Sequence, residues 1–336
     1  MAALLALALL SGCGEKIHKQ QSYVFGTLVE VSVFGEPEDK ARRVTDQVLK
    51  NFDVMHQRLH AWQPGALEQI NTALAKAKPD VPAQVTMPAE LAPILRDASQ
   101  FSARAEGLFN PAIGNLVRLW GFHSDTFEPR LPAAAEIEKW VSAKPAMTDL
   151  HIDGVMLSGN NPAVRLDLGG YAKGYALDLT AAYLKSQGVN NALINIGGNI
   201  LALGKKGSQA WKVGIQHPRR AGALAMLELH DGEAIGTSGD YQRYFELAGK
   251  RYCHLIDPRT GWPADQAQAV TVIASGVHAG TLSDVASKPL FIAGPADWRR
   301  LAGKMGISQA MFIASDGQIE TTAALARRLT WNTEPK

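Results

Sequence analysis

The stretch from Ala234 to Pro263 holds the densest group of side chains that could do chemistry. Within thirty positions it contains two aspartates, three arginines, one histidine and a neighbouring threonine and serine. Histidine and carboxylate groups transfer protons, and guanidinium groups bind phosphate. Residues 241–255 alternate around Ala248-Gly249, which predicts a β-hairpin. This hairpin would carry two polar loops, 237–240 and 254–261, at one end, and we expect a functional site there.

A second candidate site is the glycine-rich string LGGYAKGY at residues 168–175. Residues 163–167 are typical of a strand, and apolar residues with helical spacing follow from Ala172 onward. The start of a helix offers free backbone N–H groups and the positive end of the helix dipole to an anion. The glycine spacing matches neither a P-loop nor a dinucleotide fingerprint. The alternative is that the glycines only allow the helix and the strand to pack closely.

Asp284 and Lys288 form a third candidate. Residues 281–293 are predicted to form a helix that is kinked or interrupted at Pro289. Side chains four residues apart lie on the same helical face, so the carboxylate and the ammonium group are expected to be neighbours. The alternative to a functional site is an ordinary salt bridge within the helix.

The secondary-structure elements that position these residues follow one another along the chain as helices, then strands, then further helices. Asn110 followed by Pro111 is typical of a helix N-cap. This order favours a single α+β domain with mixed or antiparallel sheets over regular parallel βαβ winding. Helices are expected at 37–59, 67–76, 89–106, 133–143 and 298–305, and strands at 22–34, 149–157, 163–167, 192–196, 200–203, 211–216, 224–229 and 269–274.

The N-terminus carries a segment typical of export. An apolar run from Met1 to Leu10 is too short to span a bilayer and is followed by Ser11-Gly12-Cys13. We expect a bacterial lipoprotein signal over residues 1–13, with Cys13 as the lipidated residue, a polar tether over 14–21 and the folded domain over 22–330. The alternative is a buried N-terminal helix.

Composition narrows the class of protein. The 336 residues, 46% of them hydrophobic, are sufficient for a sizeable core. A net charge of +2, without a basic run that contains aromatic residues, gives no case for nucleic acid as a partner. If Cys13 is lipidated, Cys253 has no partner, and we expect it to be a buried strand residue and not a catalytic thiol.

Six strings together resemble the ApbE family of flavin transferases. They are the early FGT, FNPAIGNLVRLWGF, LDLGGYAKGYALD, INIGGNI, TSGDYQRYF and HLIDPRTGWP. The resemblance runs from about Tyr23 to nearly the C-terminus. It implies an α+β fold, a lipid-anchored position on the periplasmic face of a bacterial membrane, and Mg²⁺-dependent transfer of FMN from FAD to a Thr or Ser hydroxyl of an acceptor flavoprotein. The products would be a phosphoester-linked flavin and AMP.

The same resemblance implies roles for individual residues. Mg²⁺, which prefers oxygen ligands, would be bound by the Ala172 backbone carbonyl and by Asp284, with Lys288 at a third metal position. His254 would orient or deprotonate the acceptor hydroxyl, and Asp257 would fix the imidazole or touch the metal shell. The residues implied to contact FAD are Phe25, His60, Ala61, Trp62, Asn110, Gly170, Tyr171, Lys173, Tyr175, Asp240, Arg259 and Thr260.

Two kinds of contact are expected within this set. Arg259 and Thr260 have side chains suited to phosphate or adenine. Trp62 or Tyr171 is suited to stacking on a flavin or adenine ring, and core packing is the alternative for both.

The chain departs from the family pattern at three positions. Lys288 stands where the family usually has Thr, Phe25 where it often has Met, and Asn110 where Asp is common. An ammonium group cannot ligate a metal. Either Lys288 replaces part of the cation's charge, or a backbone oxygen and water complete the metal shell.

Three functions therefore remain open. The first is FMN transfer to a flavoprotein of a membrane electron-transfer system. The second is an FAD pyrophosphatase, in which water replaces the acceptor. The third is a non-catalytic lipoprotein that binds flavin.

Overall fold

The computed structural model describes residues 16–332 except 79, 125 and 127. The predicted signal and Cys13 therefore lie outside the described residues. Within the described part of the chain, no helix combines the length and the apolar character that a bilayer crossing requires.

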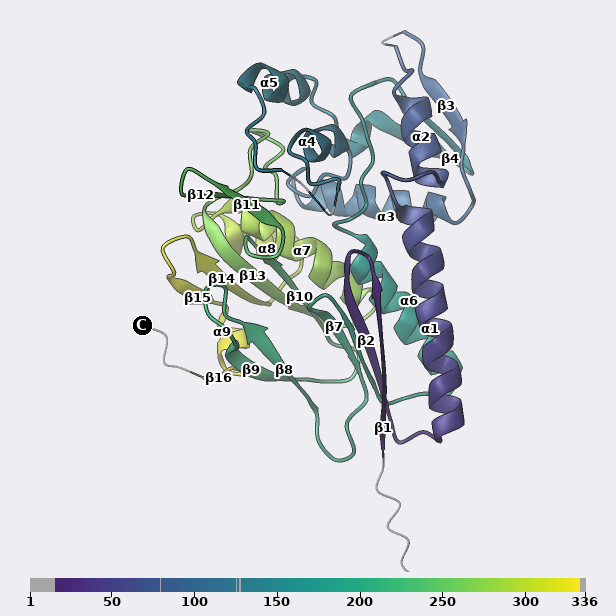
Figure 1. Ribbon diagram of the computed structural model, residues 1–336, viewed down its shortest axis with the longest axis vertical. Coiled ribbons are helices and arrows are strands. Elements are labelled where there is room, and N and C mark those ends of the chain that lie inside the picture. The colour runs from purple at the N-terminus through teal and green to yellow at the C-terminus, as the bar shows by residue number, and fades with distance from the viewer. Residues whose placement is uncertain (1–15, 79, 125, 127, 333–336) are drawn as a thin grey trace, which may run out of the picture.

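An eight-stranded antiparallel sheet forms the centre of the molecule (Figure 1). All eight residues of β13 are buried, because layers cover both faces of the sheet there. The strands lie in the order β1 (Ile17–Val24), β2 (Thr27–Phe34), β6 (Ala192–Ile196), β7 (Asn199–Leu203), β10 (Ala234–Gly239), β13 (Ala267–Ala274), β14 (Gln309–Ala314) and β15 (Ile319–Thr321).

Alternate residues of these strands enter two different cores. In β13, Val270 and Val272 point to a core shared with the helices, and Ala269 and Ile273 point to a core on the opposite face. The helices of the first core are α1 (Glu38–Leu59), α2 (Ala66–Leu74), α3 (Leu91–Arg104), α6 (Ala172–Ser186), α7 (Ala279–Ala293) and α8 (Trp298–Lys304). The second core is covered by β8 (Trp211–Gln216), β9 (Ala223–Leu229), β16 (Thr330–Trp331) and α9 (Ala323–Ala326).

A third, smaller core fixes the hairpin predicted at residues 241–255. The hairpin consists of β11 (Tyr244–Leu247) and β12 (Lys250–Cys253), and its turn residues Ala248 and Gly249 both have positive φ. Phe245 and Tyr252 stack on Trp120 at ring distances of 6.3 and 5.7 Å. Trp120 follows α4 (Gly114–Leu119), and α5 (Ala134–Ser142) completes this core.

The remaining strands form a small sheet at one end of the molecule. Its order is β3 (Ala83–Thr86), β5 (Met156–Gly159) and β4 (Leu150–Asp153), the last preceded by a 3₁₀ turn, Met147–Asp149.

Helices α6 and α7 cross at two glycines. A Cβ on Gly174 would lie 2.5 Å from the Gly280 carbonyl oxygen, and a Cβ on Gly280 would lie 2.6 Å from that of Gly174. Each helix also supplies an aspartate to the start of the other. Asp178 of α6 accepts hydrogen bonds from the Gly280 and Thr281 N–H groups, and Asp284 of α7 accepts one from the Gly174 N–H. The two helix starts are therefore fixed to each other.

The α+β class with antiparallel sheets is confirmed, and several element predictions need correction. The chain over 22–34 is not one interrupted strand but the end of β1, a Phe25-Gly26 turn and β2. Because β1 begins at Ile17, residues 17–21 belong to the sheet and not to a tether. Residues 163–167 make only an isolated bridge between Arg165 and Ile113. Apolar side chains there are buried by the helices, without a neighbouring strand.

Two helix predictions also differ from the structure. Asn110 does not cap α4, which begins at Gly114. Its side chain instead accepts a hydrogen bond from the Ala112 N–H and donates one to the Pro145 carbonyl. Helix α7 continues through Pro289, where the surrounding residues are buried, so the expected interruption does not occur.

Candidate active site

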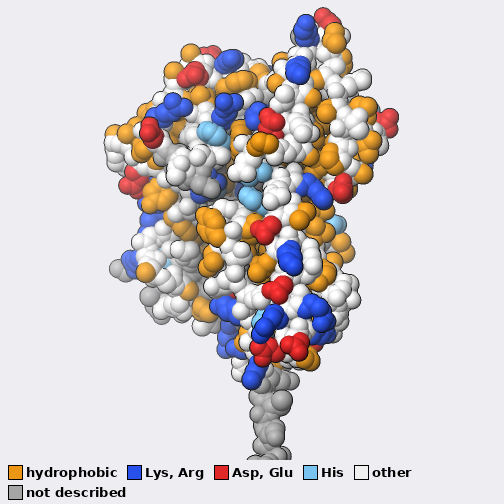
Figure 2. All heavy atoms as spheres, turned by 45° about the vertical axis from the view of Figure 1, so that its right-hand side comes forward, with side chains coloured by type: hydrophobic (Ala, Val, Ile, Leu, Met, Phe, Trp, Pro, Cys, Tyr) orange, Lys and Arg blue, Asp and Glu red, His pale blue; other side chains and the backbone are white. Residues whose placement is uncertain are grey.

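A cavity of about 530 Å³ opens where several turns meet the start of α6 and one side of α7, which contributes Asp284, Lys288 and Ile292. Its volume is in the range of small-molecule sites. Its walls come from the β1–β2 and β6–β7 turns, the end of α1, residues 108–113, the first residues of α6, and the segment next to the β11–β12 hairpin. Histidine side chains gather near the middle of one face of the molecule in Figure 2. Four histidines line the cavity: His56, His60, His123 and His254.

His254 follows β12 directly and pairs across the hairpin with Arg243. The His254 N–H donates to the Arg243 carbonyl at 3.0 Å, and the imidazole Nδ1 lies 3.2 Å from the same oxygen. When Nδ1 donates its proton there, Nε2 carries the lone pair. The side chain is half-buried in the cavity wall, so a base is available to a bound molecule.

Burial and the positive charges of Arg243 and Lys173 lower the pKa of His254 to about 3. Lys288 adds to this effect. The imidazole of the free protein is therefore neutral at pH 7. An anion that binds beside these cations would raise the pKa of His254, because its negative charge would favour the imidazolium form.

This pKa has a consequence for stability. Between pH 6.5 and about 3 the unfolded chain takes up a proton at His254 and the folded chain does not, so the free energy of unfolding falls as the pH is lowered. The loss is at most about 1.4 kcal/mol per pH unit. We expect His254→Asn to remove this loss. Urea denaturation of both proteins from pH 7 to pH 4 measures it, and a stability difference that does not change with pH would contradict the assignment.

Three cations and one carboxylate gather around His254. Arg243, Lys173 and Lys288 all act on the imidazole, and Lys173 is in turn influenced by Asp284, Lys288 and Arg243. Burial lowers the pKa of Lys173, and the neighbouring Asp284 opposes that effect. All four charged residues line the cavity. Positive charge therefore exceeds negative charge at this place, which suits an anionic ligand.

The start of α6 adds backbone donors to this positive charge. Gly169, Gly170, Ala172 and Lys173 line the cavity, so the N-terminus of a fifteen-residue helix opens into it. The helix dipole favours negative charge at that end. The sequence prediction of an anion site at the glycine junction thus coincides with the cation cluster.

Aromatic side chains also contribute to the rim of the cavity. Phe25 has a φ of 56°, a left-handed conformation that disfavours a non-glycine residue. Its ring packs edge-on against Phe52 and His56 at 5.8 and 5.5 Å, which offsets the strain of the turn. The Arg165 guanidinium covers the Trp62 ring at 4.6 Å, and the Trp62 indole N–H donates to Asp167. This rim is suited to a flat ring.

The cavity unites most of the residues that the sequence indicated. They are Phe25, His60, Ala61, Trp62, Asn110, Gly170, Ala172, Lys173, His254, Asp284 and Lys288.

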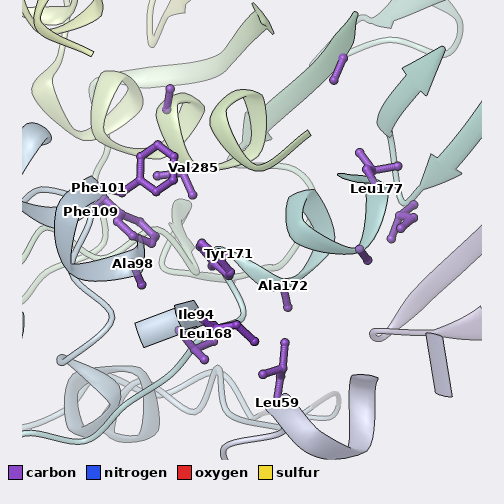
Figure 3. Close-up of a cluster of buried hydrophobic side chains, with 14 of the residues drawn as sticks. Leu59, Ile94, Ala98, Phe101, Phe109, Leu168, Tyr171, Ala172, Leu177 and Val285 are labelled. Atoms are coloured by element: carbon purple, nitrogen blue, oxygen red, sulfur yellow. The ribbon is translucent and has the colours of Figure 1, made fainter. Parts of the chain in front are cut away.

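Tyr171 does not reach the cavity. It is 1% exposed and lies among Ile94, Ala98 and Leu168 in the core (Figure 3). Its hydroxyl donates to Asp97 at 2.6 Å, and its ring stacks on Tyr175, which also lies outside the cavity lining. For Tyr171 the core-packing alternative is correct.

Asp257, Arg259 and Thr260 line a separate surface hollow of about 290 Å³. The Asp257 carboxylate accepts hydrogen bonds from the Arg259 N–H and guanidinium and thereby holds the turn. The prediction that Asp257 fixes the His254 imidazole is wrong, because Nδ1 of His254 bonds to Arg243 instead. Asp257 is close to His254 in the sequence, but the register of the β11–β12 hairpin gives His254 a different partner, Arg243.

Asp240 is also not among the residues that line the cavity. Its carboxylate is paired with Arg219 at 2.5 Å and lies 3.6 Å from Arg251. The cavity includes the neighbouring Gln242 and Arg243, which the sequence reasoning did not select. The hairpin register could have indicated Arg243, since it lies directly opposite His254.

Burial raises the pKa of the Cys253 thiol to about 12, in agreement with the prediction of a buried strand residue that takes no part in chemistry.

Comparison with known proteins finds relatives that match nearly the whole chain. A sequence profile described as the ApbE family matches residues 25–312. The FAD:protein FMN transferase of Rhodobacter capsulatus is 42% identical over 307 residues, which are 91% of this chain and 57% of that protein. The FAD:protein FMN transferase of Klebsiella pneumoniae (strain 342) is 32% identical over 265 residues, 77% of this chain and 78% of that protein. The chain thus spans little more than half of the first relative.

Solved structures with the same fold include two that cover almost all of this chain. The ApbE protein of Thermotoga maritima superposes with a TM-score of 0.83 at 27% identity, over 93% of this chain and 99% of that one. The apo form of the flavinyl transferase ApbE of Pseudomonas stutzeri gives a TM-score of 0.79 at 29% identity, over 94% and 97%.

Proposed function

The chain belongs to the ApbE family, and from that membership we propose that it transfers FMN from FAD to a hydroxyl group of an acceptor protein. The observation that carries the proposal is the meeting of three cations, a helix start and a neutral histidine in one cavity. FAD is a dinucleotide whose pyrophosphate needs neutralising charge, and its two ring systems need flat partners.

The pyrophosphate of FAD would lie at the start of α6. Lys173, Arg243 and Lys288 would neutralise its charge, and the backbone N–H groups of Gly170 and Lys173 would donate to the phosphate oxygens. Such fixed charges act most strongly on the charge that develops in the transition state.

His254 would receive the proton of the acceptor hydroxyl at Nε2. The hydroxyl oxygen forms a bond to the phosphorus on the FMN side, the bond from that phosphorus to the bridging oxygen breaks, and AMP leaves with that oxygen. The product is a phosphoester between FMN and a Ser or Thr side chain. Bound pyrophosphate raises the pKa of His254 from its low value in the free protein, which makes the imidazole a stronger base when substrate is present.

Trp62 is the residue that we propose to stack on a ring of FAD. Its indole N–H donates a hydrogen bond to Asp167, and the Arg165 guanidinium packs on one face of its ring. The orientation of the ring is therefore fixed before the ligand binds. Phe25, His60 and Asn110 line the same cavity.

The Mg²⁺ ion implied by the family resemblance is a poor fit to the donors of this chain. Lys288 has no lone pair to offer. Both carboxylate oxygens of Asp284 already accept hydrogen bonds, Oδ1 from Lys288 and Oδ2 from the Gly174 N–H. The described residues contain no cluster of three or more His, Cys, Asp or Glu that could hold a metal. A Mg²⁺ ion that arrived with FAD would have to displace Lys288 from Asp284.

The assay for the proposed function uses the full chain, FAD and candidate acceptor flavoproteins of membrane electron-transfer systems. Transfer is expected to add the mass of one FMN to an acceptor Ser or Thr and to release AMP in equal amount. FMN and AMP that accumulate at full rate without acceptor would identify an FAD pyrophosphatase instead. FAD that is recovered intact under all conditions would identify a flavin-binding protein.

We also propose that the chain is anchored to the periplasmic face of a bacterial membrane through lipidated Cys13. The Ser-Gly-Cys end of the apolar N-terminal run supports this. Cys13→Ser is expected to move the protein from the membrane fraction to the soluble fraction of lysed cells. Equal membrane association of the two proteins would refute lipidation at Cys13.

A further inference from the structure

Lys288 is bound to Asp284 by two hydrogen bonds inside the wall of the cavity. Its Nζ donates to the carboxylate Oδ1 at 2.5 Å and to the Asp284 backbone carbonyl at 2.8 Å. The side chains are only 15% and 2% exposed. An ion pair on an open helix surface contributes little and is screened by water, whereas a buried carboxylate needs a partner. The pair is therefore more than the surface salt bridge that its spacing alone would suggest.

The fold makes room for the Lys288 side chain at a glycine. A Cβ on Gly170 would lie 3.0 Å from Cε and 3.1 Å from Cδ of Lys288. The aliphatic part of the lysine thus passes directly over the glycine turn that precedes α6. The ammonium group is held between this turn and α7, next to the helix start that faces the cavity.

The charges at this place suit a pyrophosphate without a metal ion. The cations Arg243, Lys173 and Lys288 line the cavity beside two carboxylates, Asp167 and Asp284. The pyrophosphate of a dinucleotide carries about two negative charges at neutral pH, and the three cations would act on those charges directly.

We infer that Lys288 is the resident cation of the pyrophosphate site and replaces the divalent metal ion at Asp284. This inference rests on the proposed function for the identity of the phosphate ligand. Lys288 holds the Asp284 carboxylate that would otherwise bind the metal, and its own positive charge faces the cavity. FMN transfer by this chain then proceeds without Mg²⁺.

The test compares the wild-type protein with Lys288→Thr, which restores an oxygen ligand, and with Lys288→Met, which keeps the length of the side chain without charge or ligand. Lys185→Thr, at an exposed position near the end of α6, is the matched control. FMN transfer is measured in EDTA and in excess Mg²⁺. Binding of Mn²⁺ to each full-length protein is measured separately by electron paramagnetic resonance, and circular dichroism verifies folding.

The wild-type and control proteins are expected to transfer FMN equally in EDTA and in Mg²⁺ and to bind no Mn²⁺. Lys288→Thr is expected to lose about 10²- to 10³-fold in EDTA, to recover with Mg²⁺ and to bind Mn²⁺. Lys288→Met is expected to lose transfer under both conditions.

The inference is overturned if the wild-type protein binds Mn²⁺ at the site, or if its transfer stops in EDTA and returns with Mg²⁺. If the wild-type protein transfers no FMN at all, the proposed function fails, and the Mn²⁺ measurement still decides the role of Lys288. If a variant does not fold, the EDTA and Mn²⁺ results on the wild-type protein decide it.

Discussion

His254→Asn is expected to slow FMN transfer by about 10²- to 10⁴-fold while FAD still binds. The asparagine amide can donate to the Arg243 carbonyl as Nδ1 of His254 does, so the loop keeps its hydrogen bond. What the substitution removes is the lone pair on Nε2. Loss of the base therefore affects the chemical step more than the binding of FAD.

The measurement is a single-turnover transfer rate at saturating FAD, with FAD affinity determined by flavin fluorescence. His151→Asn is the matched control, because His151 is exposed on β4 and outside the cavity. Its rate should equal that of the wild-type protein. An unchanged rate in His254→Asn would exclude His254 as the base, and a loss explained wholly by weaker FAD binding would make it a positioning residue.

Gly174→Ala is expected to destabilise the folded protein by about 1–3 kcal/mol, although alanine normally favours a helix over glycine. The new Cβ would lie 2.5 Å from the Gly280 carbonyl oxygen and 2.7 Å from Thr281 Cα, and neither backbone atom can move alone. The crossing of α6 and α7 must then widen. Because Asp284 accepts a hydrogen bond from the Gly174 N–H, the cation site would be displaced as well.

Gly303→Ala is the control with the opposite sign. Gly303 lies in α8, and a Cβ there meets no atom within 4 Å. Alanine should therefore stabilise the protein by up to about 1 kcal/mol. Chemical denaturation of both variants measures the two changes. A Gly174→Ala protein as stable as the wild type would show that the two helices can separate at no cost.

The backbone of the site was largely predictable because its elements follow local rules. The Ala248-Gly249 turn requires a left-handed backbone, which glycine adopts easily. This glycine and the alternation of apolar and polar residues on both sides of it indicated the hairpin. The spacing of Asp284 and Lys288 placed them side by side, as the structure has them. Helical periodicity also gave α1 nearly to the residue.

Side-chain partners were less predictable, because residues distant in sequence decide them. Asp240 contacts Arg219 instead of the cavity, and Tyr171 turns into the core because Asp97 of α3 receives its hydroxyl. Asp257 is three residues from His254 in the sequence, but its carboxylate is bound by Arg259. The strand expected at 163–167 was inferred from apolar composition, which a segment buried by helices shares with a buried strand.

If Cys13 is lipidated as proposed, strand β1 limits how far from the membrane the cavity can lie. It runs from the lower end of the molecule in Figure 1 to the β1–β2 turn, and its eight residues span about 24 Å. Phe25 in that turn lines the cavity. The chain between Cys13 and Ile17 can add at most about 14 Å. With Cys13 held in lipid as proposed, the cavity wall at Phe25 cannot rise more than about 40 Å above the bilayer. An acceptor whose Ser or Thr is carried farther from the membrane is therefore out of reach, whatever its local sequence.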